Sequence, residues 1–311
     1  MTSEAELYNL IPQAPAHFKS GFVGIIGRPN VGKSTLMNAL VGQKIAITSP
    51  IAQTTRNRLR GILTTDEAQV IFVDTPGIHK PHHQLGRVLV QNAQIAIQSV
   101  DSLVFVVDAS VELGGGDRYI ADLLTKTESP IILGLNKVDL QRDRAVEESY
   151  LALALAQGWT VVRFSALEED GLPELQQAIY EKLEPGPYYY PPDLVTDQPE
   201  RFIMGELIRE QILRLTRDEV PHSVAVAIEK VDEQETLTHV MAVVNVERDS
   251  QKGILIGKKG AMMKEIGSAA RLQIQKMIAG KVHLELFVRV QPKWRQSRTR
   301  LAELGYRVEE E

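Results

Sequence analysis

Short apolar runs alternate with longer stretches of helix-compatible sequence through the first two thirds of the chain. The runs are rich in valine and isoleucine, are bounded by glycine, aspartate, asparagine or proline, and lie at residues 22–26, 70–73, 103–107, 131–135 and 161–164. Continuous apolar runs of this length are typical of parallel strands buried on both faces and joined by crossover helices. The pattern predicts a doubly wound α/β domain with a mainly parallel sheet, and residues 61–65 are expected to add an antiparallel edge strand.

A proline-rich stretch separates this domain from a second one. Residues 184–200 contain five prolines and three consecutive tyrosines. Proline withholds a backbone donor and interrupts helices, so this stretch is predicted to be a linker. The tyrosines are expected to pack the linker onto a domain, the alternative being ligand binding. We divide the chain into an N-terminal extension (1–19), a first domain (20–184), the linker (185–200), a second domain (201–292) and a C-terminal helix or tail (293–311).

The second domain has a different order of elements. We predict a helix at 201–216, strands at 223–230 and 239–247, a glycine-punctuated segment with a short helix at 253–260, a helix from 261 to about 279, and a last strand at 281–290. This order predicts a smaller α+β domain after the parallel sheet.

Composition narrows the setting of the protein. The chain has no cysteine, which excludes disulfides and thiolate sites and is compatible with a reducing cytosol. Residues 1–20 lack the pattern of a signal peptide, and no run approaches the roughly 20 apolar residues of a membrane span. We therefore expect a cytoplasmic protein whose membrane contact, if any, is peripheral.

Charge is distributed unevenly between the two parts. Residues 1–200 hold 16 Lys and Arg against 24 Asp and Glu, whereas residues 201–311 hold 19 against 16. A polyanion is thus expected to meet the C-terminal part, with two ordinary solvated surfaces as the alternative.

Residues 27–34, Gly-Arg-Pro-Asn-Val-Gly-Lys-Ser, fit the phosphate-binding P-loop pattern between the strand at 22–26 and a helix that begins near Lys33. Glycines let backbone N–H groups approach phosphate oxygens, and the helix N-terminus adds its positive dipole end. Lys33 would reach the β- and γ-phosphates, and Ser34 would place its hydroxyl on magnesium. The predicted phosphate-side residues are Gly27, Arg28, Pro29, Asn30, Val31, Gly32, Lys33, Ser34 and Thr35.

Residues 74–77, Asp-Thr-Pro-Gly, follow the strand at 70–73, at the carboxyl end where open α/β sheets bind ligands. A carboxylate there can hold magnesium through water, and the N–H of Gly77 can sense the γ-phosphate. The polar stretch around 53–56, Gln-Thr-Thr-Arg, suits a mobile switch, and we favour Thr55 over Thr54 as the threonine that closes over magnesium. We add Asp74, Thr75, Pro76 and Gly77 to the predicted GTP-binding residues. The candidate magnesium ligands are Ser34, Thr55 and Asp74. The candidate catalytic residues are Lys33, Thr55 and Gly77.

A second switch is expected at 77–91, where His79, His82 and His83 lie without the carboxylate or thiolate pattern of a metal site. We therefore predict no metal on these histidines.

Residues 136–139, Asn-Lys-Val-Asp, follow the strand at 131–135 and predict guanine specificity. The carboxylate of Asp139 can accept from guanine N1–H and the 2-amino group, whereas adenine offers neither donor in that arrangement. The stem of Lys137 would cover the base, and the segment 165–167 would direct a backbone N–H toward O6. The predicted base-side residues are Asn136, Lys137, Asp139, Ser165, Ala166 and Leu167, and the four motifs together predict an enzyme that binds GTP and hydrolyses it to GDP with Mg²⁺.

The set of motifs resembles the TRAFAC class of GTPases. Ile78 stands where Ras-like members of that class have the glutamine that orients water, and this resembles a subgroup with slow intrinsic hydrolysis. In that subgroup the asparagine corresponding to Asn30 helps to hold a potassium ion, so the resemblance implies K⁺ as a second ion. The alternative is that Asn30 supports the loop through bonds from its side chain to the backbone. The sequence nominates no general base.

Residues 253–260, Gly-Ile-Leu-Ile-Gly-Lys-Lys-Gly, precede the long helix of the second domain. In KH domains a Gly-x-x-Gly loop between two helices meets the sugar-phosphate chain, and an adjacent apolar groove holds about four nucleotides. The predicted RNA-binding residues of this type II KH domain are Ile254, Ile256, Gly257, Lys258, Lys259 and Gly260. Trp294, Arg295, Arg298 and Arg300 could extend the RNA surface, or form a packing helix with Leu301 and Leu304 buried.

A GTPase domain followed by a KH domain resembles the Era family of bacterial GTPases, from about residue 19 to residue 290. The resemblance implies binding near the 3′ end of 16S rRNA, a role in assembly and maturation of the 30S subunit, and loose association with the cytoplasmic face of the inner membrane. We expect a monomer. The alternative is an RNA-binding module switched by nucleotide, in which hydrolysis is incidental.

Overall fold

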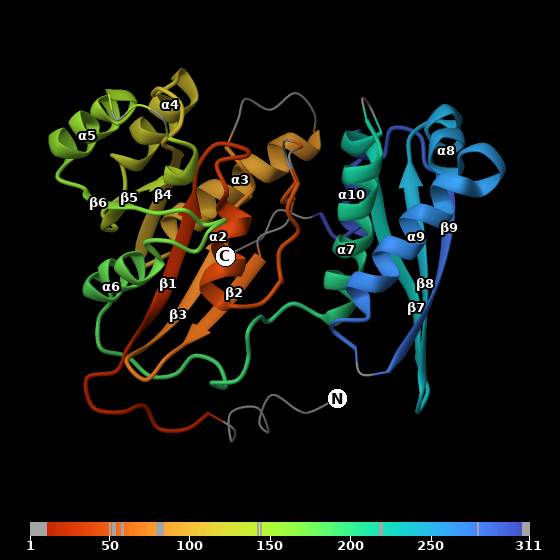
Figure 1. Ribbon diagram of the computed structural model, residues 1–311, viewed down its shortest axis with the longest axis horizontal. Helices are drawn as coiled ribbons and strands as arrows, with labels where there is room; N and C mark the ends of the chain where they lie inside the picture. The colour runs from red at the N-terminus through yellow and green to blue at the C-terminus, as the bar shows by residue number, and fades with distance from the viewer. Residues whose placement is uncertain are drawn as a thin grey trace.

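The computed structural model describes residues 11–49, 51, 54–56, 59–78, 84–141, 143, 145–217, 220–278 and 280–306. These residues form two sheet-based domains that lie side by side, with the linker running beneath them (Figure 1).

The first domain is built on a six-stranded sheet with the strand order β2-β3-β1-β4-β5-β6. Its strands are β1 (Lys19–Ile26), β2 (Leu59–Thr64), β3 (Ala68–Asp74), β4 (Ser102–Asp108), β5 (Ile131–Asn136) and β6 (Thr160–Arg163). All neighbouring strands pair in parallel except β2, which lies antiparallel to β3 at the edge. The predicted doubly wound sheet and its antiparallel edge strand are confirmed.

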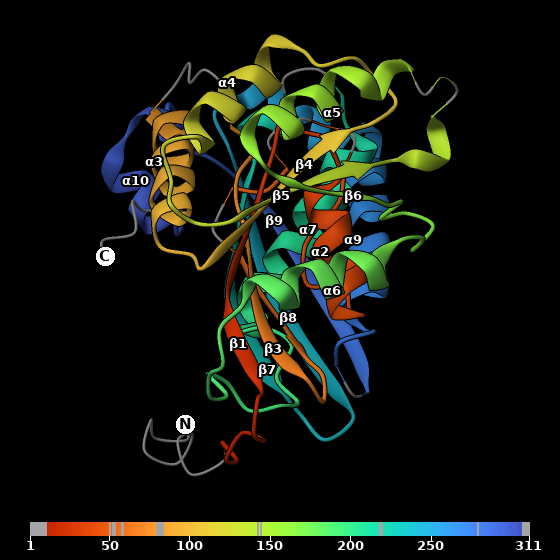
Figure 2. The same ribbon diagram turned by 90° about the vertical axis from the view of Figure 1, so that its left-hand side faces the viewer.

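Helices cover both faces of this sheet, as Figures 1 and 2 show. On one face lie α2 (Lys33–Val41) and α6 (Leu172–Lys182), and on the other lie α3 (Gln84–Gln98), α4 (Gly115–Leu124) and α5 (Ala145–Gln157). Alternate residues of β4 serve the two cores: Val104 and Val106 pack toward α2 and α6, while Phe105 and Val107 pack toward the other three helices. This double burial explains why the strands are continuously apolar in sequence.

The linker is held along the first domain by rings and by backbone bonds. Tyr188 packs on Phe18 with ring centroids 4.4 Å apart, and Tyr189 packs on Phe22 at 5.3 Å. The amide of Ile62 on the edge strand donates to the carbonyl of Val195 at 2.8 Å. The tyrosines therefore pack as predicted, and the linker satisfies part of an otherwise open sheet edge.

The second domain is a three-stranded sheet with helices on one face. Its elements are α7 (Glu200–Leu215), β7 (Ala225–Glu233), β8 (Leu237–Val246), α8 (Asp249–Ile256), α9 (Ala261–Ile274), β9 (Lys281–Val290) and α10 (Arg298–Glu303). The central strand β8 pairs antiparallel with β7 and parallel with β9. The predicted order of elements is correct, but α9 ends five residues before the expected boundary near 279. The chain leaves the helix through turns, and Gly280, whose φ is 99°, directly precedes β9.

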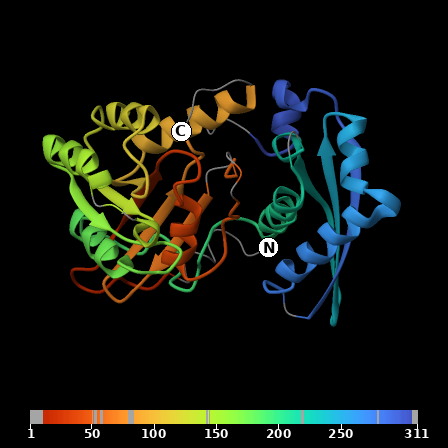
Figure 3. The ribbon, with the colours of Figure 1, turned by 45° about the horizontal axis from the view of Figure 1, so that its top comes forward.

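Among the described residues, apolar side chains join the two domains at two sites. Ile47, from the segment between α2 and β2, packs in the core of the second domain with residues of α7. On the other side, Leu85 and Leu89 of α3 pack against Trp294, Leu301 and Tyr306, and α3 points toward α10 (Figure 3). Trp294 is fully buried, so the structure favours the packing helix over the RNA-binding alternative for this segment.

Candidate functional site

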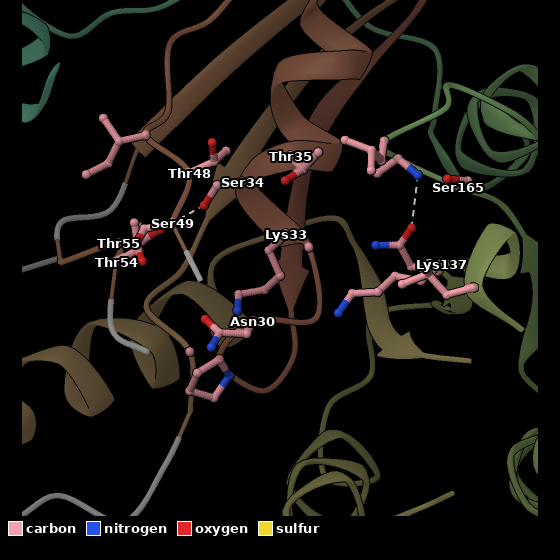
Figure 4. A pocket seen from close by; sticks show the side chains of 18 of the residues that line it. Asn30, Lys33, Ser34, Thr35, Thr48, Ser49, Thr54, Thr55, Lys137 and Ser165 are labelled. Carbon is pink, nitrogen blue, oxygen red and sulfur yellow. Dashed lines mark hydrogen bonds between the residues drawn. The ribbon is translucent and has the colours of Figure 1, made fainter. Parts of the chain in front are cut away.

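A cavity of about 650 Å³ opens at the carboxyl ends of the strands of the first sheet. In Figure 4, Lys33 and Asn30 lie at its centre, with Thr55 and Ser34 on one side and Lys137 and Ser165 on the other. The cavity brings together fourteen of the predicted residues from motifs far apart in sequence: Pro29, Asn30, Gly32, Lys33, Ser34, Thr35, Thr55, Gly77, Asn136, Lys137, Asp139, Ser165, Ala166 and Leu167.

Two glycines are required by close approach of the loops around the cavity. A Cβ atom on Gly32, whose φ is 100°, would lie 2.3 Å from the amide nitrogen of Asn136. A Cβ atom on Gly77 would lie 2.7 Å from the backbone nitrogen of Pro29. The phosphate loop therefore packs closely against the side-chain amide of Asn136 at Gly32, and the backbone of Gly77 packs closely against the backbone of Pro29, so a side chain at either glycine would push these loops apart.

Lys33 is buried at the start of α2, and its Nζ donates to the carbonyl oxygen of Arg28 at 2.9 Å. Burial lowers the pKa of Lys33 to about 8, opposed by the negative charge of Asp74. An anionic phosphate beside Nζ favours the charged amine, so occupancy of the loop would raise this pKa again.

Three oxygen-bearing side chains converge beside Lys33. The hydroxyl of Ser34 donates to Asp74 Oδ2 at 2.8 Å, the hydroxyl of Thr55 donates to the same atom at 3.1 Å, and the two hydroxyls are 2.9 Å apart. The other oxygen of Asp74, Oδ1, is buried and has no hydrogen-bond partner among the described residues. Burial also raises the pKa of Asp74. Hydroxyl and carboxylate oxygens suit Mg²⁺, so this set fits the predicted metal.

Thr54 does not join this cluster. Its hydroxyl donates to the carbonyl of Ile51 at 2.6 Å. The geometry therefore favours Thr55 over Thr54 as the threonine of the metal site.

Asn136 ties the base-side loops to the phosphate loop. Its Nδ2 donates to the carbonyl of Val31 at 2.7 Å, and its Oδ1 accepts from the amide of Ala166 at 2.9 Å. Both ends of this buried amide are thus used within the protein, which indicates a tether between loops.

Asp139 remains available to a base. It is exposed, lines the cavity, and accepts one bond from the hydroxyl of Ser165 at 2.5 Å. Lys137, with φ at 65°, holds Asp108 through an ion pair of 2.6 Å while its stem lines the cavity. The carboxylate of Asp139, placed at the cavity in this way, can accept two parallel hydrogen bonds from guanine.

Six predicted residues lie outside the cavity wall: Gly27, Arg28, Val31, Asp74, Thr75 and Pro76. Arg28 forms an ion pair with the buried Asp117 at 2.6 Å, and the hydroxyl of Thr75 donates to the carbonyl of Ile25 at 3.1 Å. Val31 is buried in the core, and Asp74 acts from behind Ser34. Arg28, Val31, Asp74 and Thr75 therefore lie behind the cavity wall and hold the loops through these contacts.

Ile78, at the glutamine position of Ras-like enzymes, is 4% exposed and packs in the core under α3. Gln53 and the histidines at 79, 82 and 83 lie outside the described residues. In the described part of the chain, no group of three or more His, Cys, Asp or Glu side chains could hold a metal.

Five residues line the cavity without having been predicted: Ile47, Thr48, Ser49, Leu140 and Arg214. Leu140 directly follows the guanine motif, so its position could have been inferred from that motif. Arg214 comes from α7 of the second domain, and no pattern in the sequence links it to the phosphate loop, which lies more than a hundred residues earlier.

The glycine-rich loop of the second domain joins α8 to α9. Gly257 has φ 69° and ψ 177°, and Gly260 has φ 80°. Lys258 and Lys259 are exposed between them. Ile254 and Ile256 are 51% and 38% exposed just before the loop, so apolar and basic side chains lie together as single-stranded RNA requires.

Among the described residues, no helix is long and apolar enough to cross a membrane.

Comparison with known proteins agrees with both halves of this arrangement. Residues 22–137 match the family described as 50S ribosome-binding GTPase, and residues 219–295 match the KH domain family. GTPase Era of Nostoc sp. (strain PCC 7120 / SAG 25.82 / UTEX 2576) is 73% identical over 302 residues, covering 96% of this chain and 93% of that protein.

Two solved structures are similar over nearly the whole chain. One is Era in complex with MgGDPNP and nucleotides 1506–1542 of 16S ribosomal RNA, with a TM-score of 0.90, 36% identity, and coverage of 93% of this chain and 99% of that chain. The other is a variant of Aquifex aeolicus Era bound to GDP and AlF4⁻, with a TM-score of 0.89, 36% identity and the same coverage. Identity and coverage of this extent show that the chain is a GTPase with a C-terminal KH domain and belongs to the Era family.

Proposed function

We propose that this GTPase binds the 3′ end of 16S rRNA through its KH domain and acts in assembly and maturation of the 30S subunit. The observation that supports this most directly is the similarity over 93% of the chain to Era in complex with nucleotides 1506–1542 of 16S rRNA. The exposed lysines of the glycine-rich loop and the exposed isoleucines beside it suit such a ligand. We assign GTP binding to residues 20–184 and RNA binding to residues 201–292.

The nucleotide site performs hydrolysis through positioned charge. Lys33 lies where it can neutralise the β- and γ-phosphate oxygens, and the N–H groups of the phosphate loop and of Gly77 donate to the same group. Ser34 and Thr55 would hold Mg²⁺ directly and Asp74 would hold it through water, and the bound ion would supply positive charge beside the transferred phosphoryl group. Because the buried Ile78 cannot orient a water by hydrogen bonding, intrinsic hydrolysis is slow.

The same site selects guanine. Asp139 accepts from N1–H and the 2-amino group, the backbone of 165–167 donates to O6, and Asn136 fixes both loops relative to the phosphates.

Asn30 is assigned to potassium. It lines the cavity beside Lys33, on the phosphate side of the site (Figure 4). Hydrolysis that is faster in potassium than in sodium, with the difference lost in Asn30→Ala, would support the ion; equal rates in both salts would favour the loop-supporting role.

The location is proposed from the composition of the chain, and the membrane association from the family resemblance. The protein acts as a cytoplasmic monomer that associates peripherally with the inner membrane.

RNA binding is tested by fluorescence anisotropy with a labelled RNA of the 16S 3′ end and a scrambled RNA of equal length. Lys258→Ala/Lys259→Ala should lose at least about tenfold in affinity and reduce the salt dependence, because two phosphate contacts are removed. The control Lys230→Ala/Lys281→Ala removes the same charge from exposed positions on the sheet, with Lys281 at the end of β9 remote from α8, and should bind normally. Equal affinity for the two RNAs, or no loss in the loop variant, would contradict the proposal.

A further inference from the structure

Arg56, the residue directly after Thr55, has its guanidinium group buried in the second domain. It is 4% exposed. Nη1 donates to the carbonyl of Val224 at 2.5 Å, and Nη2 donates to the carbonyls of Pro221 and His222 at 3.2 and 3.3 Å. A residue of the GTPase domain therefore has hydrogen-bond partners that belong to the KH domain.

Two aromatic rings lie beside the buried guanidinium group of Arg56. The guanidinium carbon is 6.0 Å from the ring centroids of both Trp294 and Tyr306. These rings stack on each other at 5.8 Å, and the indole N–H of Trp294 donates to the carbonyl of Ser223 at 3.0 Å. We call the carbonyls of 221, 222 and 224 together with these two rings the arginine receptacle.

Docking in the arginine receptacle is close to an all-or-none event. A buried guanidinium is costly unless its donors are satisfied, and here carbonyl oxygens and ring faces satisfy them. Burial lowers the pKa of Arg56, which reflects that cost. A partly docked arginine would lose its water without gaining the carbonyls, so Arg56 is either in the receptacle or in solvent.

Thr55 is fixed from both sides by this arrangement. The carbonyl of Thr54 accepts from Nη2 of Arg209, a buried residue of α7 that also pairs with Glu206. Arg56 anchors the following residue. Consecutive Cα atoms are only about 3.8 Å apart, so two anchored neighbours leave little freedom to the residue between them. The hydroxyl of Thr55 is thereby held 2.9 Å from Ser34 Oγ and 3.1 Å from Asp74 Oδ2.

We propose that Arg56 is a positioning residue of the GTPase: by docking in the arginine receptacle it holds the Thr55 hydroxyl at the metal-binding oxygens. The KH domain and the C-terminal segment that carries Trp294 and Tyr306 thus complete the triphosphate half of the nucleotide site. This inference rests on the proposed role of Thr55 at magnesium. Since that threonine engages the metal only with a γ-phosphate present, the effect is specific to GTP and leaves GDP binding unchanged.

The test compares nucleotide affinities in the full chain with Mg²⁺, using fluorescent GDP and fluorescent GDPNP, a GTP analogue that is not hydrolysed. The variants are Arg56→Ala, Arg56→Lys and, from the opposite side of the contact, Tyr306→Leu. The matched control is Arg60→Ala, because Arg60 lies four residues further on and pairs at 2.7 Å with Asp197 of the linker.

Arg56→Ala should weaken GDPNP binding by about 10-fold or more, the loss expected for a charged group with several hydrogen bonds, and leave GDP binding within about twofold. Arg56→Lys should show the same loss of GDPNP affinity, since an ammonium cannot reach three carbonyls and two rings as a planar guanidinium does. Tyr306→Leu should act in the same direction, and its effect should not add to that of Arg56→Ala. Single-turnover hydrolysis should fall with GDPNP affinity in each variant.

An equal loss of GDP and GDPNP affinity in Arg56→Ala, or the same selective loss in Arg60→Ala, would overturn the inference. Thr55→Ala separates this inference from the role on which it depends. A selective GDPNP loss in Thr55→Ala but in neither Arg56→Ala nor Tyr306→Leu would refute the positioning by Arg56 alone. An unchanged ratio in Thr55→Ala would refute the metal role of Thr55 itself.

Discussion

At the scale of single residues, the oxygens that we propose to bind magnesium are already gathered by hydrogen bonds. Ser34, Thr55 and Asp74 come from three different segments, yet their oxygens lie within 3.1 Å of one another. Among the described residues, Oδ1 of Asp74 is buried and has no hydrogen-bond partner. A cation with its bound water would supply that partner.

Removal of the Ser34 hydroxyl should therefore weaken the binding of Mg²⁺ more than it disturbs the phosphate loop. We expect Ser34→Ala to raise the Mg²⁺ concentration needed for half-maximal GTP hydrolysis by about tenfold or more, because one direct oxygen ligand is lost. The measurement is a magnesium titration of the single-turnover rate, with EDTA as the metal-free reference. Ser49→Ala is the control, since Ser49 lines the same cavity and accepts a bond from the amide of Ile51. A comparable shift in that control would contradict the assignment of Ser34.

In the proposed recognition of guanine, the carboxylate of Asp139 accepts from both N1–H and the 2-amino group. Asp139→Asn should lower the affinity for GTP by about 100-fold or more, because an amide cannot accept both donors of guanine. The same change should raise the affinity for xanthosine triphosphate, whose 2-oxo group can accept from the new amide. Competition between the two nucleotides measures the exchange, and retained preference for GTP would contradict the role of Asp139.

The sequence was sufficient to predict that Lys33, Thr55 and Asp139 come together at one cavity, because each belongs to a motif that follows a strand or precedes a helix of the first domain. It did not predict that both the nitrogen and the oxygen of the Asn136 side-chain amide form hydrogen bonds within the protein, because these bonds depend on the distance between two loops. The burial of Trp294 was open for the same reason, since a tryptophan followed by arginines fits an RNA surface as well as a core.

At the scale of elements, the glycine-rich loop contains two glycines with different constraints. A Cβ atom on Gly257 would lie 2.7 Å from the Cβ of Met262 and 2.9 Å from its backbone nitrogen. A Cβ atom on Gly260 would meet nothing within 4 Å. The first glycine is needed for space and for its backbone angles, and the second only for its positive φ.

Gly257→Ala should accordingly destabilise the KH domain by about 3 kcal/mol or more, and Gly260→Ala by only about 1 kcal/mol. Urea unfolding followed through the emission of Trp294, in a Trp159→Phe background, compares the two variants. Equal losses of stability would contradict the geometry of the loop. Because the Gly257 change disturbs the fold, the lysine pair is the cleaner probe of RNA binding.

The elements themselves were largely predictable. Strands buried on both faces are continuously apolar, so β3 and β4 could be recognised from composition alone. The end of α9 was not predictable in the same way. The helical periodicity of the sequence continues past Ile274, but the chain turns there toward β9.

At the scale of the whole molecule, the contacts between the domains reach the segments that flank the phosphate side of the nucleotide site. Arg56 and its carbonyl partner on Val224 are 168 residues apart in sequence, and α3, which follows Gly77 and Ile78 in the chain, packs on the same C-terminal segment. No local pattern could predict this pairing, because it depends on how two separately folded domains pack. It gives a physical route by which nucleotide state and RNA binding can influence each other.

The central claim is that RNA on the KH domain and GTP in the first domain act as one system. It is tested most directly by single-turnover GTP hydrolysis with and without a saturating RNA of the 16S 3′ end, in the wild-type chain, in Lys258→Ala/Lys259→Ala and in Lys230→Ala/Lys281→Ala. We predict that the RNA accelerates hydrolysis in the wild type and the second variant, and not in the loop variant at the same RNA concentration. Identical rates with and without bound RNA in the wild type would contradict the coupling.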